Sequence, residues 1–170
     1  MKTKLLYLML AVFCLSLAAC SKDEDENEKE QVVEYSESDV VGTWEPTHIK
    51  GTFHFKNDKA KFDTTYTVDK DIKENEKLEF VSSNGSFGHD FFNLNFYKDY
   101  SIGFAGKKQD GCSWSFKKGI VTMAYIDSEE LAPQTLKMKD KNTLIMSVDG
   151  VNEGMEELYE KYDLTYTKKK

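Results

Sequence analysis

The sequence of residues 40–170 predicts an all-β domain, folded as an antiparallel up-and-down barrel of about eight strands. Apolar and polar residues alternate with a period of two along many short stretches, and turn residues separate these stretches. No long stretch of the domain has helical periodicity. This pattern is typical of a barrel or of a sandwich of two sheets. We favour the barrel because consecutive hairpins close most easily into one, and closure removes strand edges that promote aggregation.

The first strands lie near the start of this domain. The pattern predicts one long strand at residues 43–55, with a bend at Pro46 and Gly51. Two further strands are expected at residues 61–68 and 78–82. These early strands show weaker alternation than the hairpins that follow, so the case for the barrel depends mainly on the later part of the chain.

The middle hairpin is expected to have a three-residue loop, Lys98–Tyr100. Such a loop pairs Phe96 with Ile102 and Leu94 with Phe104, so the apolar faces of the two strands agree. A two-residue loop would shift the register by one residue and turn Ile102 to the wrong face. The longer loop asks Tyr100 to adopt a left-handed conformation, which glycine would adopt more easily.

Two more hairpins and a last strand follow. A two-residue loop at Lys118–Gly119 places Phe116 opposite Val121 and Trp114 opposite Met123, and Gly119 supplies the positive φ that such turns favour. A further loop is expected at residues 140–142. The strands on either side of that loop have apolar residues at alternate positions: Leu136, Met138, Leu144, Met146 and Val148. One helical turn is expected within residues 151–160. A final strand follows, with an apolar face made of Tyr162, Leu164 and Tyr166.

The chain begins like an exported protein. Two lysines precede an apolar stretch from Leu5 to Ala19, which is the layout of a secretory signal. A transmembrane helix is disfavoured because spanning the hydrocarbon takes about 20 residues. The stretch ends Leu17-Ala18-Ala19-Cys20, which resembles the bacterial lipobox, in which the cysteine is lipidated and becomes the new N-terminus. The resemblance implies a signal peptide at residues 1–19 and an acylated Cys20.

Residues 20–39 are expected to join this lipid to the domain as an acidic tether. Residues 22–39 carry nine carboxylates and two lysines, and such a segment buries too little apolar surface to offset its ordering entropy. The residues from Ser21 to Asp25 also resemble the export signal of surface lipoproteins in certain gut-type Gram-negative bacteria. That resemblance implies an outer-membrane protein displayed on the cell surface, and the alternative is a solvated linker without an address.

Composition excludes several classes of partner. The whole chain carries a formal charge of −7, and the tether accounts for most of the negative charge of the mature protein. The sequence contains no arginine, which argues against recognition of nucleic acid or bidentate recognition of phosphate. The mature chain retains Cys112 after Cys20, and Cys112 cannot form an internal disulfide in the domain, so it is either a small buried hydrophobe or a reactive thiol. We expect a monomer.

No set of residues predicts catalysis, a metal site or a cofactor. His48 and His54 would share one face of a strand but lie about 20 Å apart, too far to bind one metal. The stretch Ser83–Asp90 contains Ser, His and Asp, but neighbours in sequence rarely converge as a catalytic triad does. We therefore expect that stretch to be a loop at the rim of the barrel, and we expect no enzymatic activity.

The order of these motifs resembles a family. The opening Gly42-Thr43-Trp44 is similar to the start of lipocalin-like (calycin) proteins, and three later hairpins resemble those of small lipocalin-like lipoproteins. The resemblance covers residues 40–168 and implies that Gly42 and Trp44 close one end of the barrel. Vertebrate-type lipocalins place an arginine against this tryptophan. Because this chain has none, Lys168 or Tyr166 would have to cover that end.

Inward-facing aromatic and aliphatic residues are the remaining candidates for function. These are Phe92, Leu94, Phe96, Ile102, Phe104, Trp114, Phe116, Val121 and Met123. They either fill the core or line a cavity for one small apolar ligand. The sequence therefore predicts a lipid-anchored extracytoplasmic protein that binds a small hydrophobic molecule or a glycan fragment. The alternative is a surface protein with a filled barrel that presents its loops to a protein partner.

Overall fold

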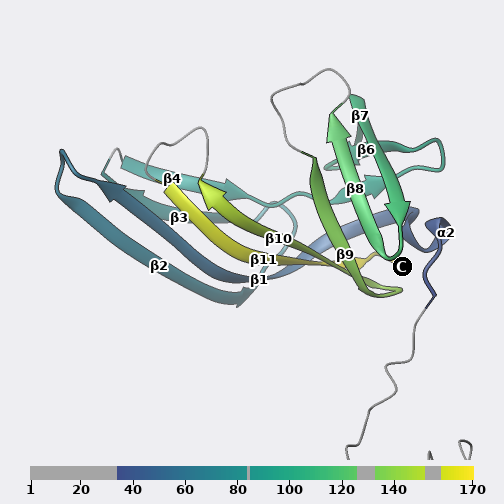
Figure 1. Cartoon of the computed structure of the whole chain (residues 1–170), viewed down its shortest axis with the longest axis horizontal. Coiled ribbons are helices and arrows are strands. Elements are labelled where there is room, and N and C mark those ends of the chain that lie inside the picture. The colour runs from purple at the N-terminus through teal and green to yellow at the C-terminus, as the bar shows by residue number, and fades with distance from the viewer. Residues whose placement is uncertain (1–33, 84, 126–132, 152–157) are drawn as a thin grey trace, which may run out of the picture. The chain divides into compact units, whose positions relative to one another are not determined.

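The computed structural model describes residues 34–83, 85–125, 133–151 and 158–170 (Figure 1). The elements in chain order are α2 (Glu37–Val40), β1 (Gly42–Asn57), β2 (Phe62–Asp71), β3 (Lys77–Ser82), β4 (Gly85–Asp90), β5 (Leu94–Phe96), β6 (Ser101–Phe104), β7 (Lys107–Lys117), β8 (Ile120–Tyr125), β9 (Gln134–Asp140), β10 (Thr143–Val151) and β11 (Leu158–Lys168).

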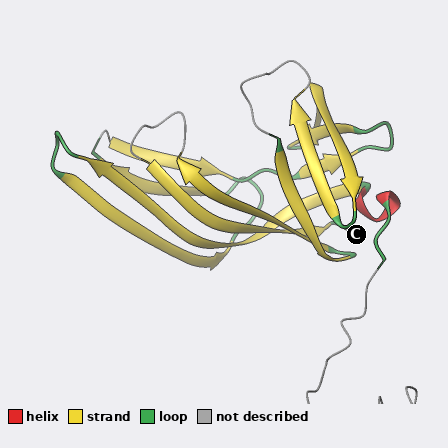
Figure 2. Ribbon diagram, in the orientation of Figure 1, coloured by secondary structure: helices red, strands yellow, loops and turns green. Residues whose placement is uncertain are grey.

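The fold is a closed antiparallel barrel of eight strands, as the sequence predicts. Strands β5 to β11 follow one another around the barrel, and β1 closes it by pairing with both β5 and β11. Strand β2 adds to the far part of β1 outside the barrel, and β3 and β4 form a separate two-stranded sheet. Among the described residues, the short α2 is the only helix (Figure 2).

Strand β1 belongs to two parts of the molecule at once. Its first residues pair with β5, and its later residues pair with β2 from His48 to Asn57. The register with β11 shifts between Pro46 and His48, where the sequence predicts a bend. At Gly51, a Cβ atom would lie 2.2 Å from the Lys161 carbonyl oxygen, so only glycine allows β1 and β11 to approach this closely.

The middle hairpins have the predicted registers. Leu94 pairs with Phe104 and Phe96 with Ile102, and Tyr100 has a φ of 62° as the three-residue loop requires. The next turn has positive φ at both Lys118 and Gly119, the conformation of a two-residue hairpin loop. Phe116 and Trp114 lie opposite Val121 and Met123.

The last hairpin and the final strand confirm the pattern with one difference. Asp140 pairs with Thr143, so the loop has two residues, and the register shifts before Leu144 to bring it opposite Met138. The Asp140 side chain accepts the Asn142 N–H at 2.7 Å, which stabilises this tighter turn. In β11, buried and exposed residues alternate from residue 158. The helical turn expected within residues 151–160 falls mainly on residues 152–157, outside the described residues, and the flanking positions are strand.

Two predictions between β3 and β5 are wrong. Residues 85–90 form strand β4 paired with β3 instead of a loop. Phe92 is 43% exposed, whereas Phe91 is 1% exposed. Residues 91–93, between β4 and β5, are not part of a strand. The Phe91 N–H donates to the Glu76 carbonyl, and the Asn93 carbonyl accepts a hydrogen bond from the Ala105 N–H. The alternation that begins at Leu94 therefore does not extend back to Phe92.

The hairpin of β3 and β4 packs over the inner face of β1, β2 and β11 through aromatic rings (Figure 1). The ring centroids of Phe53 and Phe80 are 4.4 Å apart, and those of Phe53 and Tyr162 are 5.2 Å apart. The Tyr66 hydroxyl donates to the Val81 carbonyl at 2.9 Å. These aromatic rings are continuous with the hydrophobic core of the barrel.

Trp44 and Lys168 pack together at the end of the barrel beside α2, which we call the closed end. The Trp44 indole is buried, and its N–H donates to the Val40 carbonyl at 2.7 Å. The Lys168 ammonium lies 5.3 Å from the centre of the indole ring and donates to the Asp39 carbonyl at 2.6 Å. Burial lowers the pKa of Lys168. A lysine thus packs against the buried tryptophan.

Candidate functional site at the barrel mouth

The end of the barrel opposite Trp44 contains a hollow of about 170 Å³. It lies where the interior of the barrel meets β4 and the connection to β5. Its walls are His89, Asp90, Phe91, Phe92, Leu94, Phe104, Met123, Gln134, Met146, Tyr162, Leu164 and Tyr166. Inward residues of six barrel strands thus contribute to one hollow, because alternate residues of a barrel strand point to its interior.

The middle of the hollow is apolar and flexible in shape. Leu94 and Phe104 face each other across β5 and β6, and Met146 and Leu164 do so across β10 and β11. Met123 completes the wall from β8. Methionine side chains adapt to irregular shapes, so this wall can adjust to a bound molecule.

His89 borders the hollow from β4. Its ring centroid lies 5.0 Å from that of Phe91 and 5.5 Å from that of Tyr162. Its Nε2 atom makes a 3.3 Å hydrogen bond with the Tyr162 hydroxyl, which is long for this type of bond. Burial lowers the pKa of His89, against an opposing effect of the Asp90 carboxylate. The imidazole is therefore neutral at pH 7, and Nδ1 has no hydrogen-bond partner among the described residues.

Two tyrosines of β11 supply hydroxyl groups to the walls. Tyr162 and Tyr166 are both buried, and burial raises the pKa of each phenol. Tyr166 is only 4% exposed, yet its hydroxyl has no hydrogen-bond partner within the part of the chain that is described. The hollow therefore contains unused hydrogen-bonding capacity.

The sequence prediction found part of this site. Of the predicted residues, Leu94, Phe104, Met123 and the exposed Phe92 line the hollow. Three others are buried outside its walls (Phe96, Ile102 and Trp114), and Phe116 is half-buried outside them. Sequence reasoning missed His89 and Gln134 as site residues. The alternation of β11 did identify Tyr162 and Tyr166 as inward, but nothing in it indicated a cavity beside them.

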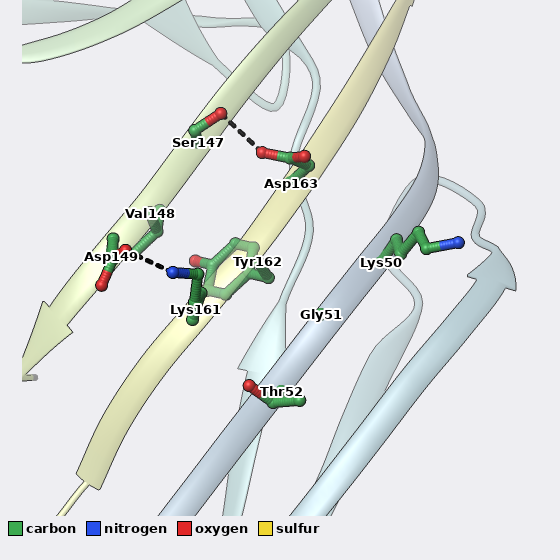
Figure 3. Close-up of a pocket in the computed structure, with 9 residues that line it drawn as sticks. All are labelled: Lys50, Gly51, Thr52, Ser147, Val148, Asp149, Lys161, Tyr162 and Asp163. Atoms are coloured by element: carbon green, nitrogen blue, oxygen red, sulfur yellow. Dashed lines mark hydrogen bonds and ion pairs between the residues drawn. The ribbon is translucent and has the colours of Figure 1, made fainter.

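A larger, open groove of about 340 Å³ crosses the outer face of β1, β10 and β11 (Figure 3). Its polar walls bond to each other: the Ser147 hydroxyl donates to Asp163 at 2.5 Å, and Lys161 pairs with Asp149 at 3.0 Å. Lys50, at its edge, pairs with Asp69 of β2. Because these groups already satisfy one another, the groove has less free polar capacity for a ligand than the mouth.

A third hollow, of about 290 Å³, lies at the closed end beside α2. Tyr100 and Trp114 form one wall, with ring centroids 5.3 Å apart. The Tyr100 hydroxyl donates to the Glu37 carboxylate at 2.9 Å, which raises the pKa of Tyr100. This contact gives a structural reason for a tyrosine in a left-handed conformation, because it ties α2 to the β5–β6 loop.

The other candidate groups are occupied or buried. His48 bonds to Asp71 and Asp69, and His54 bonds to Asp63, all on the outer face. Among the described residues, no group of His, Cys, Asp and Glu is placed to hold a metal ion. Cys112 is buried, and burial raises the pKa of its thiol, which disfavours the reactive thiolate.

No helix in the described part of the chain is both long and apolar enough to cross a membrane.

The sequence matches no protein-family model, no curated protein and no solved structure.

Proposed function

We propose that this chain is a lipid-anchored extracytoplasmic binding protein that holds a small, mostly apolar molecule in the mouth of its barrel. The observation that carries the proposal is the 170 Å³ hollow, with buried apolar walls and a few polar groups. Ligand sites commonly combine these features. The volume is below the roughly 300 Å³ of sites for drug-sized ligands, but a cavity of about 150 Å³ can hold benzene.

The size and chemistry of the walls narrow the ligand. A long acyl chain would exceed the volume of the hollow. A sugar would need a hydrogen-bond partner for each of its hydroxyl groups, whereas most of the walls are apolar. The proposal therefore favours the small hydrophobic molecule over the glycan fragment.

The leader supports the proposed location. The apolar stretch that ends at Cys20 is followed by the acidic residues of the tether. Acylation of Cys20 would attach the protein to the outer membrane, and two or more acyl chains on one protein give stable attachment. The acidic residues directly after Cys20 favour display at the cell surface. We propose a monomer with a membrane anchor and no nucleic-acid partner.

A second function has one specific observation in its favour. Most of the barrel interior is filled by fully buried side chains, among them Trp44, Phe96, Ile102, Leu136 and Leu144. A filled barrel of this kind could serve as a rigid support that presents loops to a protein partner. Binding of a small molecule in the hollow distinguishes the two functions, because only the binding protein requires the hollow to admit a ligand.

Native mass spectrometry of the protein, released from membranes in mild detergent, tests the proposed function. We expect a co-purified molecule of single-ring size, or binding of such molecules from an added panel. A Met146→Trp variant, which fills the hollow, should abolish that binding. A protein that retains its fold but binds no member of the panel would support the interaction protein instead.

The anchor has its own test. Cys20→Ala should move the protein from the membrane fraction to the soluble fraction and remove its acyl groups. Cys14→Ala is the matched control, because Cys14 lies within the apolar stretch and should leave the attachment unchanged. Membrane-bound, acylated Cys20→Ala protein would contradict the anchor assignment.

A further inference from the structure

The Tyr166 hydroxyl is the most informative group in the barrel mouth. It belongs to a side chain that is 4% exposed and borders the hollow, and it has no partner among the described residues. The hydroxyl oxygen itself is accessible from the hollow, where a bound molecule can form a hydrogen bond with it. The Tyr166 hydroxyl therefore indicates a ligand with a hydrogen-bonding group of its own.

His89 provides a second polar group from another wall. Its Nε2 atom shares the long 3.3 Å bond with Tyr162, while Nδ1 has no partner among the residues that the structure describes. Tyr162 and Tyr166 lie on the inner face of one strand with Leu164 between them. The polar groups are thus separated by an apolar wall, which fits a flat molecule whose hydroxyl lies at its edge.

Aromatic rings surround most of the hollow. His89, Phe91, Phe92, Phe104, Tyr162 and Tyr166 all contribute to its walls. Rings in such a setting favour stacked or edge-to-face contacts with another ring, which an aliphatic chain cannot make equally well. A volume of about 170 Å³ admits a single substituted ring.

The walls carry little charge. Burial lowers the pKa of His89 and raises the pKa of Tyr162 and Tyr166, so all three are neutral at pH 7. The charged groups nearby are Asp90, exposed at the rim, and Glu160, buried on β11 next to Tyr162 in the inner row. Both are acidic, and no lysine lines the hollow. An anionic ligand would be repelled and would lose its hydration without compensation.

We propose that the ligand of the barrel mouth is an uncharged, single-ring aromatic molecule with a hydroxyl group, and that Tyr166 determines this specificity by bonding to that hydroxyl. The inference rests on the proposed binding function and adds the chemical class of the ligand.

Three probes separate the parts of this inference: p-cresol, toluene and 4-hydroxybenzoate, titrated into the full chain in detergent. Toluene tests the apolar hollow alone, p-cresol adds the hydroxyl, and 4-hydroxybenzoate replaces the methyl group with a carboxylate. We expect p-cresol to bind about tenfold more tightly than toluene, because a hydrogen bond to a buried group contributes on that scale. We expect 4-hydroxybenzoate to bind at least about tenfold more weakly than p-cresol.

Variants assign the specificity to named groups. Tyr166→Phe removes only the hydroxyl, and it should weaken p-cresol binding severalfold more than it changes toluene binding. Tyr159→Phe is the matched control, because Tyr159 lies on the same strand but points outward and bonds to Asp149. Thermal unfolding of each variant shows whether it is folded.

The outcomes separate this inference from the function beneath it. Equal binding of toluene and p-cresol, unaffected by Tyr166→Phe, would overturn the hydroxyl specificity and leave the binding function intact. Tighter binding of 4-hydroxybenzoate than of p-cresol would overturn the preference for an uncharged ligand. Failure of all three probes to bind the folded protein would contradict both proposals.

Discussion

The two ends of the barrel treat their buried polar groups differently. At the closed end, the Trp44 N–H and the Lys168 ammonium each donate to a backbone carbonyl, so both groups have partners. At the mouth, the Tyr166 hydroxyl and one nitrogen of His89 have none among the described residues. The contacts at the closed end therefore contribute stability, while the mouth leaves polar groups of its walls available to a bound molecule.

The largest effect is expected at the closed end. Trp44→Ala should lower the free energy of unfolding by about 3–5 kcal/mol, because it removes a large, fully buried side chain and leaves a cavity. Chemical denaturation measures this loss. Trp44→Phe is the control and should recover most of the stability, since it keeps an aromatic ring but not the N–H. A loss below about 1 kcal/mol for Trp44→Ala would show that this end contributes little.

Lys168→Met should give the next largest loss, about 1–2 kcal/mol. It removes the cation from the face of Trp44 and the hydrogen bond to the Asp39 carbonyl, while keeping most of the aliphatic chain. Lys168→Arg should retain much of the stability, because a guanidinium can also stack on an indole. Equal losses for both variants would mean that the cation is not the stabilising feature.

At the mouth, His89 should make stability depend on pH. Burial lowers the pKa of His89 in the folded protein, so the unfolded chain binds the proton more readily. This contribution to stability is fully present above the unfolded pKa of about 6.5 and is lost as the pH falls below it. Asp90, Glu160 and Tyr162 are the ionisable groups that face or adjoin the imidazole.

Unfolding curves between pH 5 and 8 measure this effect, with His89→Gln as the comparison. The variant should lose less stability on acidification than the parent, because it lacks the imidazole whose pKa burial lowers. His48 and His54 are present in both proteins, so they do not account for a difference. An identical pH dependence in the two proteins would mean that His89 does not titrate differently in the folded state.

Tyr166→Phe should have the smallest effect on stability of the unliganded protein, within about 1 kcal/mol of the parent and not below it. Its hydroxyl makes no hydrogen bond to the described residues, so its removal relieves a desolvation cost without breaking a contact. Thermal unfolding without ligand measures the change. A loss of several kcal/mol would show that the hydroxyl has an internal partner, and the contrast between the two ends would then disappear.

The closed barrel was largely predictable because the length of each hairpin loop determines which face of the sheet the following side chains occupy. A one-residue change in loop length would turn Ile102 and Phe104 outward, so the apolar pattern alone determined the three-residue loop and the left-handed Tyr100. Because the sequence contains no arginine, the residue expected to cover Trp44 could be limited to Lys168 or Tyr166. These features depend on residues close in sequence or on a composition that leaves few choices.

The mouth was less predictable because distant segments form it. His89 and Tyr162 are separated by 73 residues, and no local pattern indicates that they meet. The irregular chain before Leu94 broke the alternation, so Phe92 was placed inward while Phe91 took the buried position. The packing of β3 and β4 on the aromatic rings of β1, β2 and β11 likewise depends on tertiary contacts. Four of the predicted ligand-binding residues line the hollow, but the sequence alone could not locate the hollow between them.

Amide chemical-shift mapping of the protein during titration with p-cresol tests the central contrast most directly. Our account predicts shifts that cluster at His89 to Leu94, at Met123 and along Tyr162 to Tyr166, with little change at Gly42 and Trp44. The largest shifts at the closed end, or along the outer groove of β1, β10 and β11, would contradict the assignment of the mouth as the binding site.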